Sequence, residues 1–243
     1  MPETFVVGDI HGALKALEQL IEILPLQNQD RLIFLGDYVD GWPESAGVLD
    51  YLMELQKHYF CTFIKGNHDI WCESWLSGEA PSPEWLQHGG LATAESYSRL
   101  DAKQIGAHLE FLDRMKLYYI DEENRLFIHA GFSSVHGPLH ERYESNFTWD
   151  RTLWETALAT DGRIAPDSKK YPRRLLLFKE IYIGHTPTIN FDSDIPMHAA
   201  SVWNIDTGAG FYGKLSAVNI TTKQYFQSDI VKDLYPDAKG RGM

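Results

Sequence analysis

The chain has 243 residues, of which 44% are hydrophobic and 23% are charged. This globular composition supplies enough apolar side chains for a substantial core, but no apolar run is long enough to cross a bilayer. The net charge of −12 opposes long-range attraction to nucleic-acid polymers. We therefore expect neither a nucleic-acid polymer nor a membrane as a partner.

The N-terminus and the cysteines suggest the cellular setting. The chain starts Met-Pro-Glu-Thr and leads directly into an apolar run, unlike the basic start of a secretory signal. Cys61 and Cys72 are too few for a disulfide scaffold or a thiolate metal site. We expect a cytoplasmic protein, with a monomer as the default, in which both cysteines serve as small hydrophobic residues.

The first part of the chain alternates between short apolar strands and amphipathic helices. Helical spacing of apolar residues over 13–24 ends at Pro25, and a second helix is predicted to open at Pro43. Strands are predicted over residues 5–8, 31–35 and 59–64. This βαβαβ order predicts an α/β fold with a mainly parallel sheet and right-handed crossovers.

The rest of the chain is less regular. Residues 69–117 show helical spacing and are interpreted as a helical cap region beside the sheet. Residues 132–178 are interpreted as irregular and polar, and the last dozen residues as loosely held. Further strands are predicted over residues 117–120, 125–129, 181–184, 201–205, 215–220 and 224–227. Because no long flexible linker interrupts the chain, residues 1–243 are predicted to form one domain.

Polar side chains follow five of the predicted strands, at the point where each strand ends. Open α/β sheets gather their ligands at such positions. The residues are found in the motifs Gly8-Asp9-Ile10-His11-Gly12, Gly36-Asp37-Tyr38-Val39-Asp40 and Gly66-Asn67-His68-Asp69, and at His129 and His185. Carboxylate, amide and imidazole ligands together suit Mn, Fe, Zn or similar ions. The pattern therefore predicts a site for two divalent metals and a dinuclear phosphoester hydrolase.

Taken in this order, the three motifs resemble the signature of the calcineurin-like metallophosphoesterases. Within that group they are similar to the compact bacterial and phage members of the PPP-type phosphoprotein phosphatases. The later blocks are matched by His129-Ala130-Gly131, Gly184-His185-Thr186-Pro187 and Asp206-Thr207-Gly208-Ala209. The resemblance implies a four-layer α/β fold, in which two mixed β-sheets form a sandwich flanked by helices, with helical and loop insertions.

The resemblance also implies two divalent metal ions as cofactors, with Mn favoured and Fe, Zn or Ni as alternatives. Asp9 and His11 would bind one metal, and Asp37 would bridge the two. The second metal would be held by Asn67, His129 and His185. Water held between two dications is acidified and can attack phosphorus as hydroxide.

His68 would be the general acid that protonates the leaving alkoxide, with Asp40 hydrogen-bonded to its ring. We expect the carboxylate to orient the imidazole and to favour its protonated form. Asp69 stands where protein phosphatases of this family have glutamate, and we expect it to hold the loop by hydrogen bonds. Gly89-Gly90 is expected to allow a close backbone approach near the site.

The phosphate-binding arginines match the family only in part. In the resembled family an arginine and then a glycine follow the second Asp of the middle motif, whereas this chain has Gly41 and Trp42. Thr148-Trp149-Asp150-Arg151 resembles a later block that supplies another arginine, which implies that Arg151 binds phosphate together with Asn67. We expect that an arginine introduced at position 41 would raise monoesterase efficiency.

Three functions remain open on the sequence. A metal-dependent phosphomonoesterase of the serine/threonine protein phosphatase type is favoured, acting on a phosphorylated protein or a small phosphoester. The missing arginine and Asp69 favour instead a dinucleoside polyphosphate hydrolase or phosphodiesterase, since those substrates carry less charge on the reacting phosphorus. Trp42, Trp71 and Trp75 could stack on a nucleoside or simply pack internally. The third possibility is an inactive scaffold that binds a protein.

Overall fold

The computed structural model describes residues 2–241, and its first sheet carries the N-terminal motifs. In the order β10-β9-β1-β2-β3, strands β1, β2 and β3 pair in parallel, and β9 is antiparallel to both of its neighbours, β1 and β10. Their bounds are β1 Thr4–Val7, β2 Arg31–Phe34, β3 Phe60–Phe63, β9 Lys214–Asn219 and β10 Tyr225–Ile230. The three parallel strands are those that the sequence predicted, and a polar motif begins within three residues of the end of each.

The second sheet is also mixed, with strand order β4-β5-β6-β8-β7. Its central strands β5, β6 and β8 are parallel, and β4 and β7 are antiparallel edge strands. The bounds are β4 Tyr118–Ile120, β5 Arg125–Ile128, β6 Glu180–Ile183, β7 Met197–Ala199 and β8 Val202–Asn204. The strand β7 was not predicted, because three residues at a sheet edge give too short a pattern.

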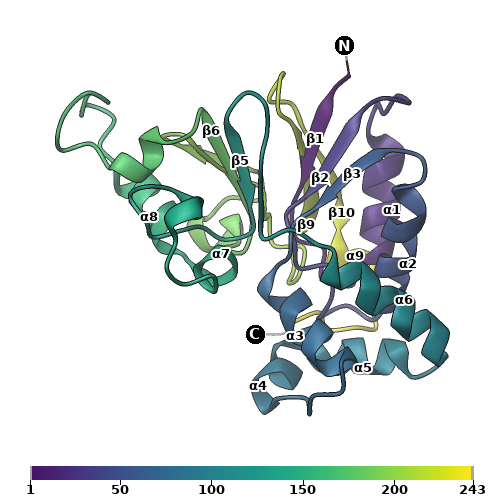
Figure 1. The fold of residues 1–243 in the computed structure, drawn as a ribbon. Helices are drawn as coiled ribbons and strands as arrows, with labels where there is room; N and C mark the ends of the chain where they lie inside the picture. The colour runs from purple at the N-terminus through teal and green to yellow at the C-terminus, as the bar shows by residue number, and fades with distance from the viewer. Residues whose placement is uncertain (1, 242–243) are drawn as a thin grey trace.

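The two sheets pack face to face and are flanked by helices (Figure 1). Val6 and Ile33 of the first sheet meet Phe127 and Tyr182 of the second in one buried apolar cluster. The first sheet is covered by α1 (Leu14–Ile23), α2 (Ser45–Leu55) and α9 (Val231–Leu234), and the second by α7 (Asn146–Trp149) and α8 (Thr152–Ala159). This arrangement confirms the predicted four-layer α/β sandwich.

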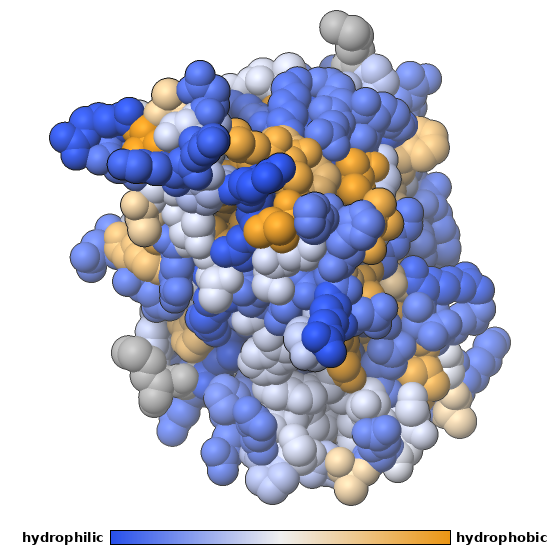
Figure 2. Space-filling model, turned by 60° about the vertical axis from the view of Figure 1, so that its left-hand side comes forward, coloured by the Kyte–Doolittle hydropathy of each residue, from blue (hydrophilic) through white to orange (hydrophobic). Residues whose placement is uncertain are grey.

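The segment that we interpreted as a cap, residues 69–117, is largely helical. It comprises α3 (Asn67–Leu76), α4 (Pro83–Trp85), a π-helical turn over Leu86–Gly90, α5 (Leu91–Tyr97) and α6 (Ala102–Asp113). Because α3 starts directly after β3, the cap lies at the end of the sheet where the motifs are placed (Figure 1). At the level of α3 to α5, the face drawn in Figure 2 is largely hydrophilic, and its hydrophobic residues lie mainly higher up.

Residues 132–178 are more ordered than the sequence suggested. They contain α7, α8 and two 3-10 turns, Pro138–His140 and Arg173–Leu176. Trp154 of α8 is buried in the core of the second sheet. A local signal for α8 exists, because the carboxylate of Asp150 accepts the backbone N–H groups of Thr152 and Leu153. The interpretation of this segment as irregular was therefore wrong for residues 146–159, where α7 and α8 lie.

The C-terminal tail is also held in place, contrary to expectation. Tyr235 is buried in the apolar cluster between the first sheet and its helices, and Ala238 packs against that cluster. The backbone N–H of Arg241 donates to the carbonyl of Gly210 at 2.9 Å. Of the two free cysteines, Cys72 is buried and Cys61 half-buried. None of the helices within residues 2–241 has both the length and the hydropathy that a bilayer crossing requires.

Candidate active site

The strand-end motifs fold into strained turns. His11 and Asp37 each have a φ of 54°, Asp40 has 71° and His185 has 65°. Residues other than glycine seldom adopt the left-handed region, and such strain concentrates at functional sites. These turns bring side chains from both sheets to one point.

Two glycines leave room for the carboxylates at that point. A Cβ at Gly184 would lie 2.0 Å from Oδ1 of Asp9, and a Cβ at Gly66 would lie 2.2 Å from Oδ1 of Asp37. Neither distance is possible for a real side chain. Glycine at these positions therefore lets the two carboxylates sit against the neighbouring backbone.

Asp37 lies at the centre of the site. His11, Asp37 and His68 form one group whose possible ligand atoms lie within 4.8 Å of one another, and Asp37, His129 and His185 form a second. Oδ2 of Asp37 is 3.6 Å from Nε2 of His11 and 3.4 Å from Nε2 of His129. Asp37 thus stands between two sets of ligands, at the position expected of a bridging carboxylate.

The histidine rings are oriented by backbone carbonyls. Nδ1 of His11 lies 3.1 Å from the carbonyl oxygens of both Val39 and Asp40, and Nδ1 of His129 lies 2.8 Å from that of Leu35. When Nδ1 donates to a carbonyl, Nε2 keeps its lone pair for a cation, which is the usual arrangement around protein-bound metals. Oδ1 of Asn67, 3.2 Å from Nε2 of His129, joins the same side.

Two buried atoms that could ligate a metal support a cation at this site. Oδ1 of Asp9 and Nε2 of His185 are inaccessible to solvent and have no hydrogen-bond partner within residues 2–241. The other carboxylate oxygen of Asp9 accepts the backbone N–H of His185 at 3.0 Å. Unpaired buried polar atoms are costly, and carboxylate oxygen and imidazole nitrogen are both metal ligands. The residues therefore fit a pair of divalent cations.

The pKa values of Asp37 and Asp9 shift in opposite directions, although burial raises both. Burial raises the pKa of Asp37, but the neighbouring His129 and His68 outweigh it and hold that pKa well below its ordinary value. Burial, reinforced by Asp206, raises the pKa of Asp9 well above its usual range. A cation beside Asp9 would offset both effects and favour its ionised form.

Burial favours the neutral form of two imidazoles among the predicted metal ligands. Burial lowers the pKa of His11 well below its ordinary value, and the charge of Arg241 lowers it further. Burial, and then the charge of His129, lowers the pKa of His185 in the same way. Neutral imidazole is the form that binds metal ions.

His68 and Asp40 form the predicted pair, with Nδ1 and Oδ2 separated by 2.7 Å. Asp40 also accepts hydrogen bonds from Trp85 Nε1 at 2.7 Å and from Thr93 Oγ1 at 2.6 Å. Burial lowers the pKa of His68 to about 3 and raises the pKa of Asp40 to about 8. The expectation that the carboxylate favours a protonated imidazole was therefore wrong, because burial disfavours separated charges in this pair.

Asp69 fixes the backbone around the site. Its carboxylate accepts the backbone N–H groups of Gly66 and Asp37, both at 2.8 Å, and of Tyr38 at 2.9 Å. The close approach predicted at Gly89 is also present, since a Cβ there would lie 2.6 Å from the backbone nitrogen of Gly41. Both residues shape the site without facing its pocket.

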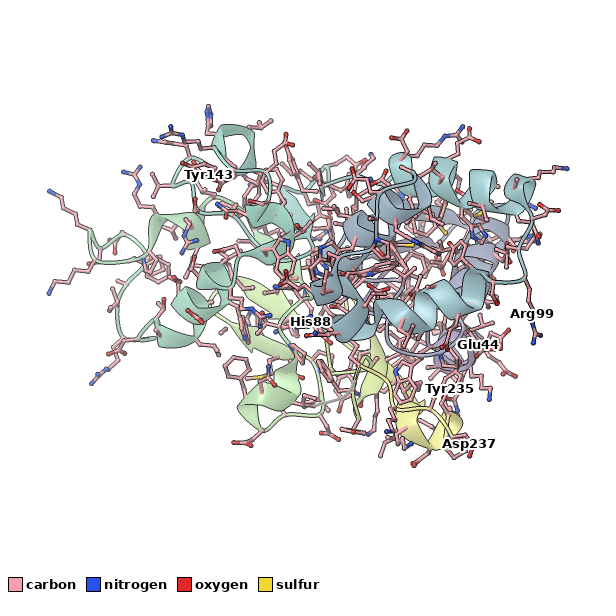
Figure 3. The ribbon with its side chains drawn as sticks, turned by 90° about the horizontal axis from the view of Figure 1, so that it is seen from below. Glu44, His88, Arg99, Tyr143, Tyr235 and Asp237 are labelled. Carbon is pink, nitrogen blue, oxygen red and sulfur yellow. The ribbon has the colours of Figure 1, made fainter. Side chains whose placement is uncertain are left out.

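A small pocket opens beside these groups. It is lined by Asn67, His68, Trp71, Glu84, His88, Trp149, Arg151, His185 and Arg241. Arg151 and Asn67 thus reach the region where a phosphate was expected. In Figure 3 His88 lies between the cap helices and the segment with α7 and α8. Sequence reasoning gave no role to Trp85, Thr93, His88 or Arg241, because none belongs to a motif.

The three tryptophans have different surroundings. Trp71 lines the pocket, with its ring 5.2 Å from that of Trp149. Trp42 is fully buried, and Trp75 packs against Trp85 in the cap. Only Trp71 among the three is therefore positioned to contact a substrate.

Comparisons with known proteins agree with this geometry. The family model for calcineurin-like phosphoesterases matches residues 3–212. The chain is 26% identical to an asymmetrical bis(5'-nucleosyl)-tetraphosphatase of Oceanobacillus iheyensis, over 90% of this chain and 89% of that protein. It is 29% identical to serine/threonine-protein phosphatase 1 of Salmonella typhimurium, over 89% and 91% of the two chains.

A solved structure shares the fold. The protein serine/threonine phosphatase from Saccharomyces cerevisiae has a TM-score of 0.60 and 14% identity, and the match covers 100% of this chain and 84% of that one. At such low identity the likeness concerns the fold alone. It supports the four-layer arrangement described above.

Proposed function

The chain belongs to the calcineurin-like phosphoesterase family, and we propose that it is a phosphomonoesterase of the protein phosphatase type. The family supplies the reaction class, a metal-dependent hydrolysis of phosphoesters. The observation that carries the proposal is the position of Asp37 between two groups of ligand atoms, each within 4.8 Å. Such a shared carboxylate suits two neighbouring divalent ions.

We assign the ligands from these two groups and from the unpaired buried oxygen of Asp9, and we keep His68 as the general acid. Asp9 and His11 would hold one ion and Asp37 both, and the second ion would be held by Asn67, His129 and His185. When bound, two cations supply an acidified water as nucleophile and neutralise charge on the phosphoryl oxygens. The mix of carboxylate, amide and imidazole ligands suits Mn, Fe, Zn and similar ions, and we propose Mn among them because of the family resemblance.

The remaining roles belong to residues at the pocket. His68 would protonate the leaving alkoxide through Nε2, because Nδ1 is held by Asp40. Arg151 and Asn67 line the pocket and would bind the phosphoryl oxygens. His68 and Asp40 together would thus provide the proton, while the arginine fixes the substrate.

An aryl phosphate assay with two variants tests this proposal. Turnover should require added Mn and should fall at least about a hundredfold in Asp37→Asn and in His68→Asn. Asp50→Asn and His58→Asn make the same chemical changes at exposed side chains and should retain activity. Activity that persists in both site variants would rule out the assigned mechanism.

A second candidate function rests on the aromatic wall of the pocket. Trp71 and Trp149 line it, and Trp149 is 43% exposed, so a nucleobase could stack there. Seven curated relatives, that of Oceanobacillus iheyensis among them, carry the name of a bis(5'-nucleosyl)-tetraphosphatase. This observation favours a dinucleoside polyphosphate hydrolase over a simple phosphodiesterase.

A substrate panel separates the two candidates. We expect kcat/KM to be higher for a phosphopeptide than for diadenosine tetraphosphate or a bis-aryl phosphate. If diadenosine tetraphosphate is preferred, and Trp149→Ala removes that preference while sparing the aryl phosphate, the second candidate is correct. Trp149 is suited to this test because it lies outside the metal ligands.

A further inference from the structure

The C-terminal tail brings an arginine to the place where the middle motif lacks one. Gly41 has a φ of 114°, and a Cβ built on it would lie 2.8 Å from Cγ of Arg241. The side chain of Arg241 therefore fills the space that a side chain at position 41 would enter. From there it lines the same pocket as Arg151.

The second departure from the family motif supports the tail from below. The ring of Trp42, where glycine is usual, stacks on Tyr235 with centroids 5.4 Å apart. Gly240, at a φ of 59°, passes so close that a Cβ would lie 2.8 Å from Cζ2 of Trp42. The indole Nε1 of Trp42 donates to the carbonyl of Ala209 at 2.7 Å. Gly41 and Trp42 thus form one structural change, which accommodates the tail.

Further contacts fix the arginine itself. Its backbone N–H donates to Gly210 at 2.9 Å, and its guanidinium lies 5.0 Å from the ring centroid of Phe211. Upstream, the hydroxyl of Tyr235 donates to Glu44, and the two residues lie side by side in Figure 3. These contacts pre-organise Arg241 and reduce the entropy that a ligand would otherwise have to remove.

The guanidinium still has donors available for a ligand. Within residues 2–241 its hydrogen-bond partner is Nε2 of His11, at 3.3 Å from Nη1, and its buried Nε has none. A cation bound by His11 would use the same nitrogen lone pair and would release that donor as well. Arginine presents five donors in a planar fork that matches phosphoryl oxygens.

We propose that Arg241 replaces the missing motif arginine and, together with Arg151, clamps the phosphoryl group of the substrate. The inference rests on the proposed function and narrows it. Two guanidinium groups face a pocket wall with a single carboxylate, Glu84, so a dianionic monoester is favoured over a less charged diester. The absence of an arginine after Asp40 thus ceases to argue for nucleotide substrates.

The structure also reverses the expectation for Gly41→Arg. The left-handed backbone strains any side chain at position 41, and the new side chain would collide with Arg241. We therefore expect this substitution to displace the tail and to lower monoesterase efficiency. The expected gain would require the space that Arg241 already fills.

Binding of inorganic phosphate to the full-length, Mn-loaded protein tests the clamp. Calorimetry should show affinity about ten- to a hundredfold weaker for Arg241→Ala than for the wild type, with a similar loss of kcat/KM on an aryl phosphate. Arg241→Lys should be intermediate, because it keeps the charge but loses the fork. Lys239→Ala removes an exposed charge from the same tail and should change neither quantity.

Rescue separates binding from a merely structural effect. Added guanidinium ion should restore part of the activity of Arg241→Ala and should leave the wild type unchanged. If Arg241→Ala binds phosphate as tightly as the wild type, the clamp is wrong. If the only change in Arg241→Ala is tighter Mn binding, Arg241 competes with the metal ion for Nε2 of His11 instead. The clamp is wrong in that case too.

The proposed function can fail separately. A wild-type protein without turnover on any phosphoester, but with phosphate affinity that depends on Arg241, would refute the function and retain the clamp.

Discussion

Asp69 illustrates how a single carboxylate can position a site through its backbone without being one of the proposed metal ligands. It is fully buried and accepts three backbone N–H groups, including that of the central Asp37. Burial raises its pKa to about 7, although these hydrogen bonds favour the ionised form. One side chain therefore holds the backbone of its own motif and that of the middle motif.

Asp69→Asn should weaken metal binding more than it weakens the fold. The amide keeps one acceptor oxygen but turns an N–H group toward backbone donors, so the loop that carries Asp37 shifts. We expect Mn affinity to fall about ten- to a hundredfold, the usual cost of losing support behind a ligand. Calorimetric titration with Mn measures this. Asp101→Asn, an exposed carboxylate that also accepts two backbone N–H groups, should leave Mn affinity unchanged.

Glu141 organises the loop that leads to Arg151. It accepts backbone N–H groups from Ser133 at 2.5 Å and Ser134 at 3.0 Å, and the side-chain amide of Asn146 at 3.1 Å. Partial burial raises its pKa, but the hydrogen bonds outweigh this and lower it from 4.5 to about 2. Because the folded-state pKa is depressed, Glu141 stabilises the fold above its unfolded pKa and loses that contribution as pH falls.

Glu141→Gln should therefore destabilise the protein by about 1 kcal/mol near neutral pH. The difference from the wild type should shrink as pH falls from 4.5 toward 2, the range set by the two pKa values. Urea unfolding at several pH values measures it. Glu144→Gln changes an exposed carboxylate of the same loop and should give no comparable difference. A loss that stays constant across that range would contradict the assignment.

At the scale of elements, the cap is joined to the proposed catalytic pair, His68 and Asp40. Trp85 of α4 donates to Asp40, and Gly90 leaves room for its ring, since a Cβ there would lie 2.4 Å from Cε2. Thr93 of α5 donates to the other carboxylate oxygen. Two cap helices therefore orient the carboxylate that orients His68.

Trp85→Phe should lower kcat with little change in KM. The substitution keeps most of the buried ring but removes the hydrogen bond to Asp40, and the loss of a donor from this buried oxygen costs about 1–3 kcal/mol. Steady-state kinetics on an aryl phosphate should show kcat reduced about tenfold or more. Trp75→Phe makes the same change next to Trp85 and should retain wild-type kcat. Equal losses in both variants would show that packing, rather than the hydrogen bond, is responsible.

The elements also show which parts of the site could be predicted from sequence. The sequence could place three of the proposed ligands, Asp9, Asp37 and Asn67, because a short apolar strand precedes each of them. Both the strand pattern and the polar motif after it are local features of the sequence. Arg241 could not be placed in this way, since it lies 230 residues from His11 and its role depends on how the tail packs. The departure at Gly41 was visible, but its compensation required the tertiary structure. The prediction of one domain over residues 1–243 and of a monomer remains a prediction.

At the scale of the whole molecule, the proposed metal site joins the two sheets. Asp9 and Asp37 follow β1 and β2 of the first sheet, whereas His129 and His185 follow β5 and β6 of the second. Behind them the sheets meet through apolar side chains, which fix the separation of the ligands. A cation held by residues of both sheets would stabilise the sandwich in addition to enabling hydrolysis, since it binds only the folded chain.

Mn should therefore raise the Tm of the protein, and a chelator should reverse the effect. At a concentration about a hundredfold above the Kd, binding to the folded state alone contributes about 2.7 kcal/mol, or roughly 5–10 °C for a chain of this size. Thermal unfolding over a Mn series measures the shift. Asp37→Asn should abolish the shift in Tm, because the same carboxylate oxygen of Asp37 lies next to both His11 and His129. Asp50→Asn, on the surface of α2, should preserve the shift. If Mn does not change the Tm of the wild type, these side chains do not hold the ions between the sheets.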